Sequence, residues 1–218
     1  MQEKIVYRFE TPVYPGDILY INLIEKYSCI NDCLFCFRPR TKEDVGKPNI
    51  YEKKAGSFLY LEKSPSIEEL QKAIKKELKE NDKEIAIIGL GEPLLYANKV
   101  IALVNWIKSN YNLKVRIDTN GVCDKNIVSK LENAGLDEIR ISLNAIDEKS
   151  YNQLCRPKVT NGFNLHIEFV KACVNSNINT YVSFVIGFRL SKTKEEYLEF
   201  AKSLGIEDNK VIFREFVS

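Results

Sequence analysis

Three cysteines, Cys29, Cys33 and Cys36, lie within eight residues directly after an apolar run. Side chains of a strand alternate between two faces, and a regular helix would not bring residues at this spacing to one point either. We therefore expect a loop that wraps around a bound group. Thiolates bind metal, and a set of three leaves one coordination position without a protein ligand. The pattern predicts an open, reactive metal site rather than a closed structural one.

The spacing Cys-x3-Cys-x2-Cys, with Phe35 immediately before the last cysteine, resembles the cluster loop of the radical S-adenosylmethionine superfamily. The resemblance implies that Cys29, Cys33 and Cys36 hold three irons of a 4Fe-4S cluster. It also implies that the amino and carboxylate groups of S-adenosyl-L-methionine chelate the fourth iron. The alternatives are a zinc knuckle with its fourth ligand elsewhere in the chain, or three unrelated cysteines.

The composition is that of a soluble globular protein, and a chain of 218 residues fits one domain, which we predict over 1–218. The net charge of +2 is too small to produce an electrostatic potential that by itself would attract nucleic acid or a membrane surface. The amino terminus lacks the pattern of a secretory signal, and no apolar run is long enough to span a membrane. Six cysteines are too few for a disulfide scaffold. These features predict a cytoplasmic protein.

Six apolar strands alternate with helical patterns, an order that implies parallel pairing through right-handed crossovers. Two of the helices open with capping boxes, Ser66 with Glu69 and Thr193 with Glu196. Pattern alone permits an open doubly wound sheet or a partial barrel. The resemblance favours an α/β fold of the second kind, a partial (β/α)6 TIM-type barrel with the cluster at the carboxyl ends of its strands. The strands are expected at 18–24, 84–88, 114–118, 138–143, 181–186 and 211–216.

Two predicted strands end in motifs that resemble the cofactor-binding elements of the superfamily. The second leads into Gly91-Glu92-Pro93, similar to the Gly-Glu-Pro motif that receives the methionine amino group. A Gly/Pro turn with an exposed Glu is the alternative. The third leads into Thr-Asn-Gly, and the resemblance puts Asn120 beside the cofactor. Asn-Gly is also the usual hairpin signal, although a capped helix rather than a pairing strand follows here.

Further cofactor contacts are expected around the later strands. Ser142 and Asn144 share a face by the period of two and match the ribose and carboxylate contact motif, with a helix-capping turn as the alternative. The guanidinium group of Arg156 could bind the methionine carboxylate through two parallel hydrogen bonds. The alternative is that Arg156 forms an ion pair at the surface. Ile186, with Phe213 or Phe216, could form a wall for the adenine or belong to the core.

The block from Ile141 to Pro157 narrows the resemblance to the small radical SAM proteins described as TatD-family-associated, which bring no settled substrate. The resemblance implies that a reduced cluster, fed by a reductant such as ferredoxin or flavodoxin, cleaves S-adenosylmethionine. The products would be methionine and a 5'-deoxyadenosyl radical that abstracts hydrogen from an unidentified substrate. Cys123 and Cys155 are weak candidates for a second cluster, a substrate contact or a radical relay. Buried inert thiols are the commoner alternative, and His166 is expected to be structural.

Three other functions stay open from the sequence. A 7-carboxy-7-deazaguanine synthase-like enzyme is one, although Phe37-Arg38 stand where an Asp-Thr pair would suit a magnesium site. An enzyme that activates a glycyl-radical partner is another, with the long polar stretch 37–64 as a lid or docking segment. A non-catalytic zinc or nucleic-acid-binding module is the third. Its basic residues between Arg38 and Lys54 are interrupted by acidic ones, a pattern typical of a solvated face.

Overall fold

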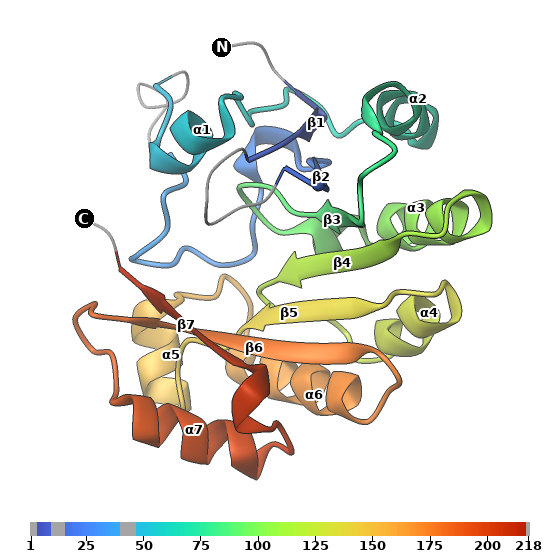
Figure 1. Ribbon diagram of the computed structural model, residues 1–218. Coiled ribbons are helices and arrows are strands. Elements are labelled where there is room, and N and C mark those ends of the chain that lie inside the picture. Colours follow the sequence, from blue (N-terminus) through green and yellow to red (C-terminus); the bar gives the residue numbers. More distant parts are fainter. Residues whose placement is uncertain (1–3, 10–15, 40–46, 217–218) are drawn as a thin grey trace. The chain divides into compact units, whose positions relative to one another are not determined.

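The computed structural model describes residues 4–9, 16–39 and 47–216, which form two compact units (Figure 1). The first unit comprises Met1–Cys29, Phe37–Ile117 and Ala134–Leu136. The second comprises Ile30–Cys36, Asp118–Asn133 and Asp137–Ser218. Each unit is described by itself below. The cysteine segment contributes to both, because Cys29 ends a stretch of the first unit and the next two cysteines belong to the second.

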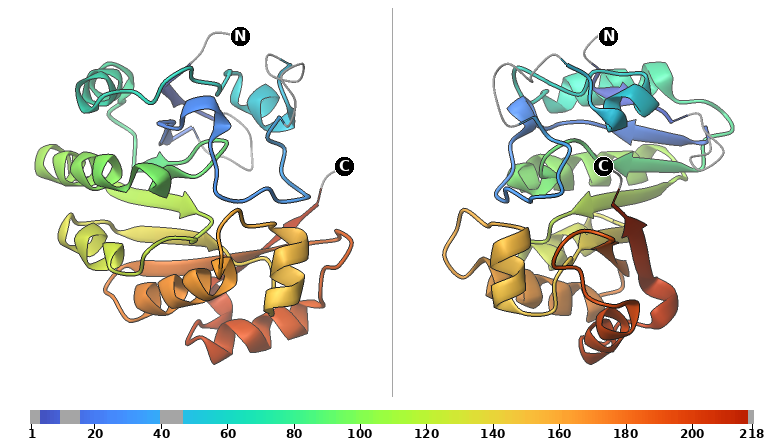
Figure 2. Two further views of the ribbon diagram at one scale, coloured as in Figure 1. Left: turned by 180° about the vertical axis from the view of Figure 1, so that it is seen from behind. Right: turned by 90° about the vertical axis from the view of Figure 1, so that its left-hand side faces the viewer.

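The first unit is built on strands that follow one another in chain order. The short strand β1 pairs antiparallel with β2, and β2 to β4 are parallel, with Ile21 opposite Ile87 and Ile87 opposite Ile117. These isoleucines are fully buried, as expected for parallel strands covered on both faces. Helices α2 and α3 lie on one side of the strands and α1 on the other (Figures 1 and 2). The elements are β1 (Val6–Tyr7), β2 (Ile18–Ile21), α1 (Ile50–Ala55), α2 (Ile67–Glu77), β3 (Glu84–Ile87), α3 (Ala97–Asn110) and β4 (Lys114–Thr119).

The second unit repeats the same alternation with three parallel strands. Its core includes a stacked pair, Phe184 and Tyr197, whose ring centroids are 4.1 Å apart. Figure 2 shows α6 and α7 running alongside these strands. None of the helices in the described ranges is both long enough and apolar enough to cross a bilayer. The elements are α4 (Ile127–Asn133), β5 (Glu138–Ser142), α5 (Glu148–Leu154), α6 (Gly162–Val174), β6 (Asn179–Ile186), α7 (Lys194–Ser203) and β7 (Val211–Glu215).

The six strands predicted from the sequence are confirmed as β2 to β7, with ends that shift by a few residues. Both capping boxes are confirmed as well, since Ser66 accepts from the Glu69 amide and Thr193 from the Glu196 amide. Strand β1 was not predicted. Two residues are too few to show an alternating pattern, so its existence follows from pairing with β2 rather than from local sequence.

The polar stretch 37–64 contains a helix that the sequence analysis did not predict. Residues 40–46 of this stretch lie outside the described residues. Beyond them, Asn49 caps the start of α1: its side chain accepts from the Glu52 amide, and the Glu52 side chain accepts in return from the Asn49 amide. The helix ends at Gly56 in the left-handed conformation. The Asn-x-x-Glu spacing was a capping-box signal that could have revealed this helix.

Candidate functional site

The backbone that leads into Cys29 is held in an unusual conformation. Lys26 and Tyr27 both have positive φ, 49° and 52°, which non-glycine residues adopt rarely. The Tyr27 hydroxyl donates a hydrogen bond of 2.7 Å to the fully buried Glu52 carboxylate of α1. Arg38 donates to the Tyr27 carbonyl at 3.1 Å. Helix α1 therefore supports the entry to the cysteine segment, a role for Glu52 that sequence reasoning missed.

The Gly-Glu-Pro motif supports the same backbone from another side. The Glu92 amide donates to the Ser28 carbonyl at 2.9 Å. Gly91 has φ +144°, and a Cβ there would lie 2.5 Å from the Ser28 carbonyl oxygen and 2.6 Å from Ile24 Cγ2. Only glycine fits this contact, because both the conformation and the space exclude a side chain.

The side chain of Glu92 is only 2% exposed and accepts the Leu94 amide at 2.9 Å. Pro93 begins the short turn that follows. The alternative of a turn with an exposed Glu is therefore wrong. The predicted contact of Glu92 and Pro93 with a methionine amino group stays a prediction.

In the second unit, the loop that carries the other two cysteines is bound along its length to the segment after α5. Amides of Asp32 and Leu34 donate to the carbonyls of Cys155 and Leu154 at 3.0 and 2.9 Å. Asn31 and Pro157 form an antiparallel bridge. Asn31 also donates to the buried Tyr151 hydroxyl at 3.1 Å. The Leu-Cys-Arg-Pro block singled out in the sequence is therefore the support of the cysteine loop.

Cys33 and Cys36 lie in one turn, since the Cys36 amide donates to the Cys33 carbonyl at 3.1 Å. Both thiols are partly exposed, as is Cys29. Phe35 between them packs edge-to-face against Phe188, at 6.0 Å between ring centroids. In type, exposure and irregular backbone the three cysteines fit a metal cluster. Among the described residues, no three His, Cys, Asp or Glu side chains form a group that could hold a metal ion, so convergence of the three thiols stays a prediction.

The Thr-Asn-Gly element forms a tight turn at the end of β4. The Asn120 side chain accepts from the Val122 amide at 2.8 Å, and the Thr119 hydroxyl accepts from the Gly121 amide at 3.0 Å. Gly121 has φ +71°, and a Cβ there would lie 2.9 Å from Nδ1 of His166. The chain continues into α4, so the hairpin alternative is wrong. A contact between Asn120 and a cofactor stays a prediction.

His166 lies buried beneath this turn. Its ring stacks on that of Tyr151, with centroids 5.1 Å apart. The ring lies against the backbone of Asn120 and Gly121, whose effect on its pKa is smaller than that of burial. Burial disfavours the charged form and lowers the pKa of His166 from 6.5 to about 4. The histidine is therefore neutral and structural, as the sequence analysis expected.

This pKa shift predicts a loss of stability in acid. Because the His166 pKa is lower in the folded state, protonation favours the unfolded chain as the pH falls from 6.5 to about 4. We expect the free energy of unfolding to fall by about 3 kcal/mol over that range from this group alone. Urea unfolding across the range should show this component in the wild type and not in His166→Phe. An equal pH dependence in both proteins would contradict the prediction.

The end of β5 differs from the extended strand that the sequence suggested. The strand stops at Ser142, and Asn144 has φ +58°, so the period of two does not continue between them. Asn144 donates to the Ser142 carbonyl at 3.3 Å and accepts from the Val185 amide at 3.1 Å. This side chain therefore connects the ends of β5 and β6. Contacts of Ser142 and Asn144 with a ribose or carboxylate stay predictions.

Arg156 forms an ion pair with Asp32 of the cysteine loop, at 3.4 Å between Nη2 and Oδ2. The two side chains are 47% and 28% exposed, so the pair itself contributes little to stability. This arrangement matches the surface ion pair that the sequence left as the alternative. Ile186 lies at the end of β6, where its carbonyl accepts the Phe216 amide at 2.8 Å.

The remaining cysteines differ in exposure. Cys155 is 1% exposed and belongs to an apolar cluster with Tyr151 and Leu154. Cys173 is fully buried, and burial raises its thiol pKa to about 12. Cys123 is partly exposed. Burial makes Cys155 and Cys173 poor nucleophiles and favours the structural alternative for Cys155.

Curated proteins similar to this chain include enzymes named as probable GTP 3',8-cyclases. One, from Methanococcus maripaludis (strain C7), is 29% identical over 141 residues, which are 65% of this chain and 41% of that protein. Another, from Saccharolobus islandicus (strain Y.N.15.51), is 27% identical over 123 residues, which are 56% of this chain and 39% of that protein. The chain therefore spans about two-fifths of the length of these relatives.

Solved structures show the fold. Streptococcus suis SuiB bound to S-adenosylmethionine superposes with a TM-score of 0.63 at 18% identity, over 93% of this chain and 42% of SuiB. Methylornithine synthase (PylB) gives a TM-score of 0.61 at 15% identity, over 94% of this chain and 56% of that protein. The predicted partial barrel is thereby confirmed, with the antiparallel β1 added. Residues 27–204, which hold the cysteine loop and all the strand-end motifs, match the model of the Radical SAM superfamily, and the chain belongs to that superfamily.

Proposed function

We propose that this protein is a radical SAM enzyme. Cys29, Cys33 and Cys36 hold a 4Fe-4S cluster, and S-adenosyl-L-methionine binds over the strand-end motifs. When bound, these groups supply reductive cleavage of the carbon–sulfur bond to methionine and a 5'-deoxyadenosyl radical, which takes hydrogen from a substrate. The protein acts in the cytoplasm and receives its electron from a reductant such as ferredoxin or flavodoxin.

One observation carries the proposal: the motifs of the superfamily support the cysteine segment directly. Gly91 and Glu92 contact Ser28, immediately before Cys29, through a 2.9 Å hydrogen bond and a contact that only glycine permits. In the second unit, residues 154–158 bind the loop of Cys33 and Cys36 through its backbone. Ligands on irregular loops need such support to be held in place for a cluster.

The chain's own residues have three tasks in this proposal. The thiols of the three cysteines, all partly exposed, bind iron as thiolates. Asn120 and Asn144 order the turns after β4 and β5, beside which S-adenosylmethionine would bind. Apolar packing around Phe35 and Phe188 excludes water beside the cysteine loop in the second unit.

The similarity to probable GTP 3',8-cyclases supports the class of chemistry rather than a substrate. It is confined to about two-fifths of those proteins. The substrate of this chain is therefore left unassigned.

The test is anaerobic reconstitution with iron and sulfide, reduction with dithionite and addition of S-adenosylmethionine. A single reduced 4Fe-4S paramagnetic resonance signal that shifts with S-adenosylmethionine, together with release of 5'-deoxyadenosine, is the expected result. Zinc in place of iron in protein purified without oxygen, or a cluster whose spectrum ignores S-adenosylmethionine, would overturn the proposal in favour of a binding module.

A further inference from the structure

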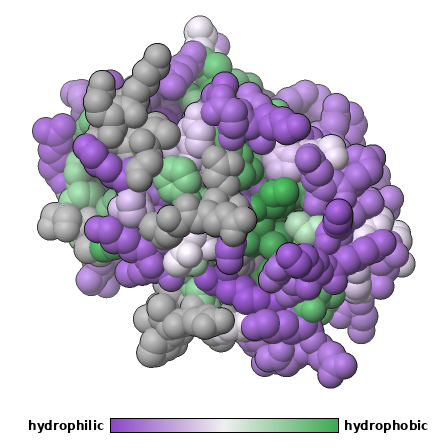
Figure 3. All heavy atoms as spheres, turned by 90° about the horizontal axis from the view of Figure 1, so that it is seen from above, coloured by the Kyte–Doolittle hydropathy of each residue, from purple (hydrophilic) through white to green (hydrophobic). Residues whose placement is uncertain are grey.

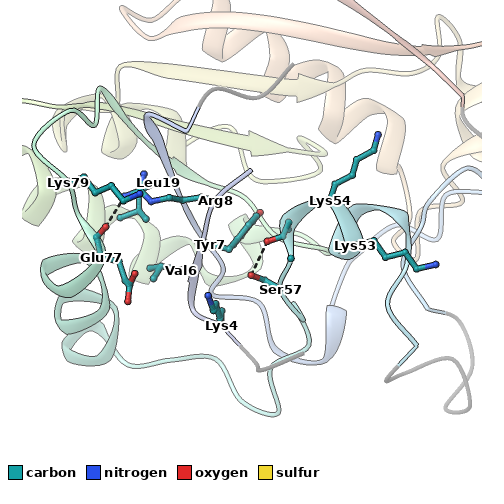
Figure 4. Close-up of a pocket in the computed structure, with 12 residues that line it drawn as sticks. Lys4, Val6, Tyr7, Arg8, Leu19, Lys53, Lys54, Ser57, Glu77 and Lys79 are labelled. Atoms are coloured by element: carbon teal, nitrogen blue, oxygen red, sulfur yellow. Dashed lines mark hydrogen bonds between the residues drawn. The ribbon is translucent and has the colours of Figure 1, made fainter. Parts of the chain in front are cut away.

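A basic groove lies along strand β1 of the first unit and is lined by none of the three cysteines of the predicted cluster loop. Its volume is about 390 Å³. Strand β1 forms its floor, and the carboxyl-terminal ends of α1 and α2 flank it (Figure 4). Figure 3, which looks onto this side, shows hydrophobic atoms in a depression surrounded by hydrophilic side chains. The lining residues are Lys4, Val6, Tyr7, Arg8, Leu19, Lys53, Lys54, Ala55, Gly56, Ser57, Glu77 and Lys79.

The backbone of β1 presents hydrogen-bonding groups to this groove. In the antiparallel pair, Val6 stands opposite Ile21, and the Asn22 amide donates to the Ile5 carbonyl at 2.7 Å. Residues that bond across an antiparallel pair alternate with residues that do not. The N–H and C=O of Val6 therefore point away from β2. On that outer side the Lys4 amide already donates to the Phe58 carbonyl at 3.3 Å, whereas no described residue bonds to the N–H or C=O of Val6. The part of this edge at Val6 is therefore left as a template for another strand.

Four lysines give the groove most of its positive charge, and of these Lys79 also interacts electrostatically with the Asp82 carboxylate. Lys4, Lys53, Lys54 and Lys79 are exposed and form no ion pair within the described ranges. Among the residues that line the groove, only Glu77 carries a carboxylate.

Arg8, the fifth basic residue of the groove, already has a partner within the protein, because its Nη2 donates to the buried Asp82 carboxylate at 2.7 Å. Lys53 and Lys54 lie in the last turn of α1, where they also complement the helix dipole. That role does not account for Lys4 or for Lys79, which lie outside any helix.

We propose that an acidic, extended segment of a partner protein binds in this groove by adding as a strand to β1. Its backbone bonds to the open N–H and C=O of Val6, and its carboxylates face the four lysines. The floor favours apolar side chains between the acidic ones, because Val6 and Leu19 are 8% and 1% exposed at its base. Backbone bonds give such a complex affinity, and alternating side chains give specificity. The site is independent of the radical chemistry proposed above.

The experiment uses the full chain with its cluster reconstituted and a fluorescein-labelled peptide of about ten residues in which Glu alternates with Val. Fluorescence anisotropy should show binding that weakens with salt. Two further peptides, one with Lys in place of Glu and one with Pro at its centre, should bind at least about tenfold more weakly.

Two variants separate charge from strand addition. Lys53→Glu with Lys54→Glu should weaken binding at least about tenfold. The control, Lys149→Glu with Lys171→Glu, makes the same charge change at exposed lysines of the second unit and should leave binding unchanged. Val6→Pro removes the outward N–H without removing a bond to β2, so it should abolish binding while circular dichroism shows a folded chain.

Three outcomes would overturn the proposal. The first is no binding of the Glu-Val peptide. The second is equal binding of the proline-containing peptide or by Val6→Pro, which would indicate charge attraction without strand addition. The third is full displacement by millimolar inorganic phosphate at constant ionic strength, which would indicate a site for small anions.

Discussion

Replacing Cys33 by Ala is expected to remove nearly all bound iron from the reconstituted protein and, with it, the cluster's visible absorption. Two remaining thiols cannot hold three irons, and cluster binding requires every thiolate of the set. The loop itself should keep its fold, because it is held by backbone bonds to Leu154 and Cys155 rather than by the Cys33 side chain. Iron analysis and the electronic spectrum after anaerobic reconstitution give the measurement.

The matched control is Cys123→Ala, which removes a partly exposed thiol outside the loop. It should keep the iron content and spectrum of the wild type. If Cys33→Ala retained a full cluster, the ligand assignment would fail. If Cys123→Ala lost about half of the iron instead, a second cluster would be present, and Cys123 would be one of its ligands.

Periodicity and capping residues predicted the strands β2 to β7 and most helices, because each of these elements carries its own local signal. The two misses have different causes. The two residues of β1 become a strand only by pairing with β2, and pairing is a tertiary event. Helix α1 did carry a capping box at Asn49, but the Pro and Gly residues of this polar stretch suggested an irregular connection instead.

The site was predictable as a set of motifs but not as a set of contacts. Cysteine spacing predicted a metal-binding loop, and the strand-end motifs predicted the edge on which it would lie. Nothing in the local sequence indicated that Glu52 would accept the Tyr27 hydroxyl or that Asn31 would bond to Tyr151. Those partners are 25 and 120 residues apart in the chain, and only the fold brings them together.

Asn144 gives the clearest case of a pattern that fails at a strand end. A period of two put it on the same face as Ser142, but its φ of +58° ends the strand and turns its side chain to the backbone of β6. Asn tolerates the left-handed conformation well, so the residue type was compatible with both outcomes. The alternation of a strand is informative only while the strand continues.

Replacing Gly91 by Ala should lower both the free energy of unfolding and the amount of cluster that the protein binds. The new Cβ would lie 2.5 Å from the Ser28 carbonyl oxygen, and a φ of +144° is strained for any residue with a side chain. Strain and overpacking together should lower the free energy of unfolding by about 3 kcal/mol. The displaced backbone is that of Ser28, next to Cys29, so iron content after reconstitution should also fall.

Gly56→Ala is the matched control for this change. Gly56 also has positive φ, +57°, but no atom lies within 4 Å of the position its Cβ would take. That variant should lose only about 1 kcal/mol and keep its iron. Urea unfolding of the apo-protein and iron analysis of the reconstituted protein measure the two effects separately. Equal losses in both variants would mean that the contact between Gly91 and Ser28 has no part in holding Cys29, because conformational strain alone would then explain the result.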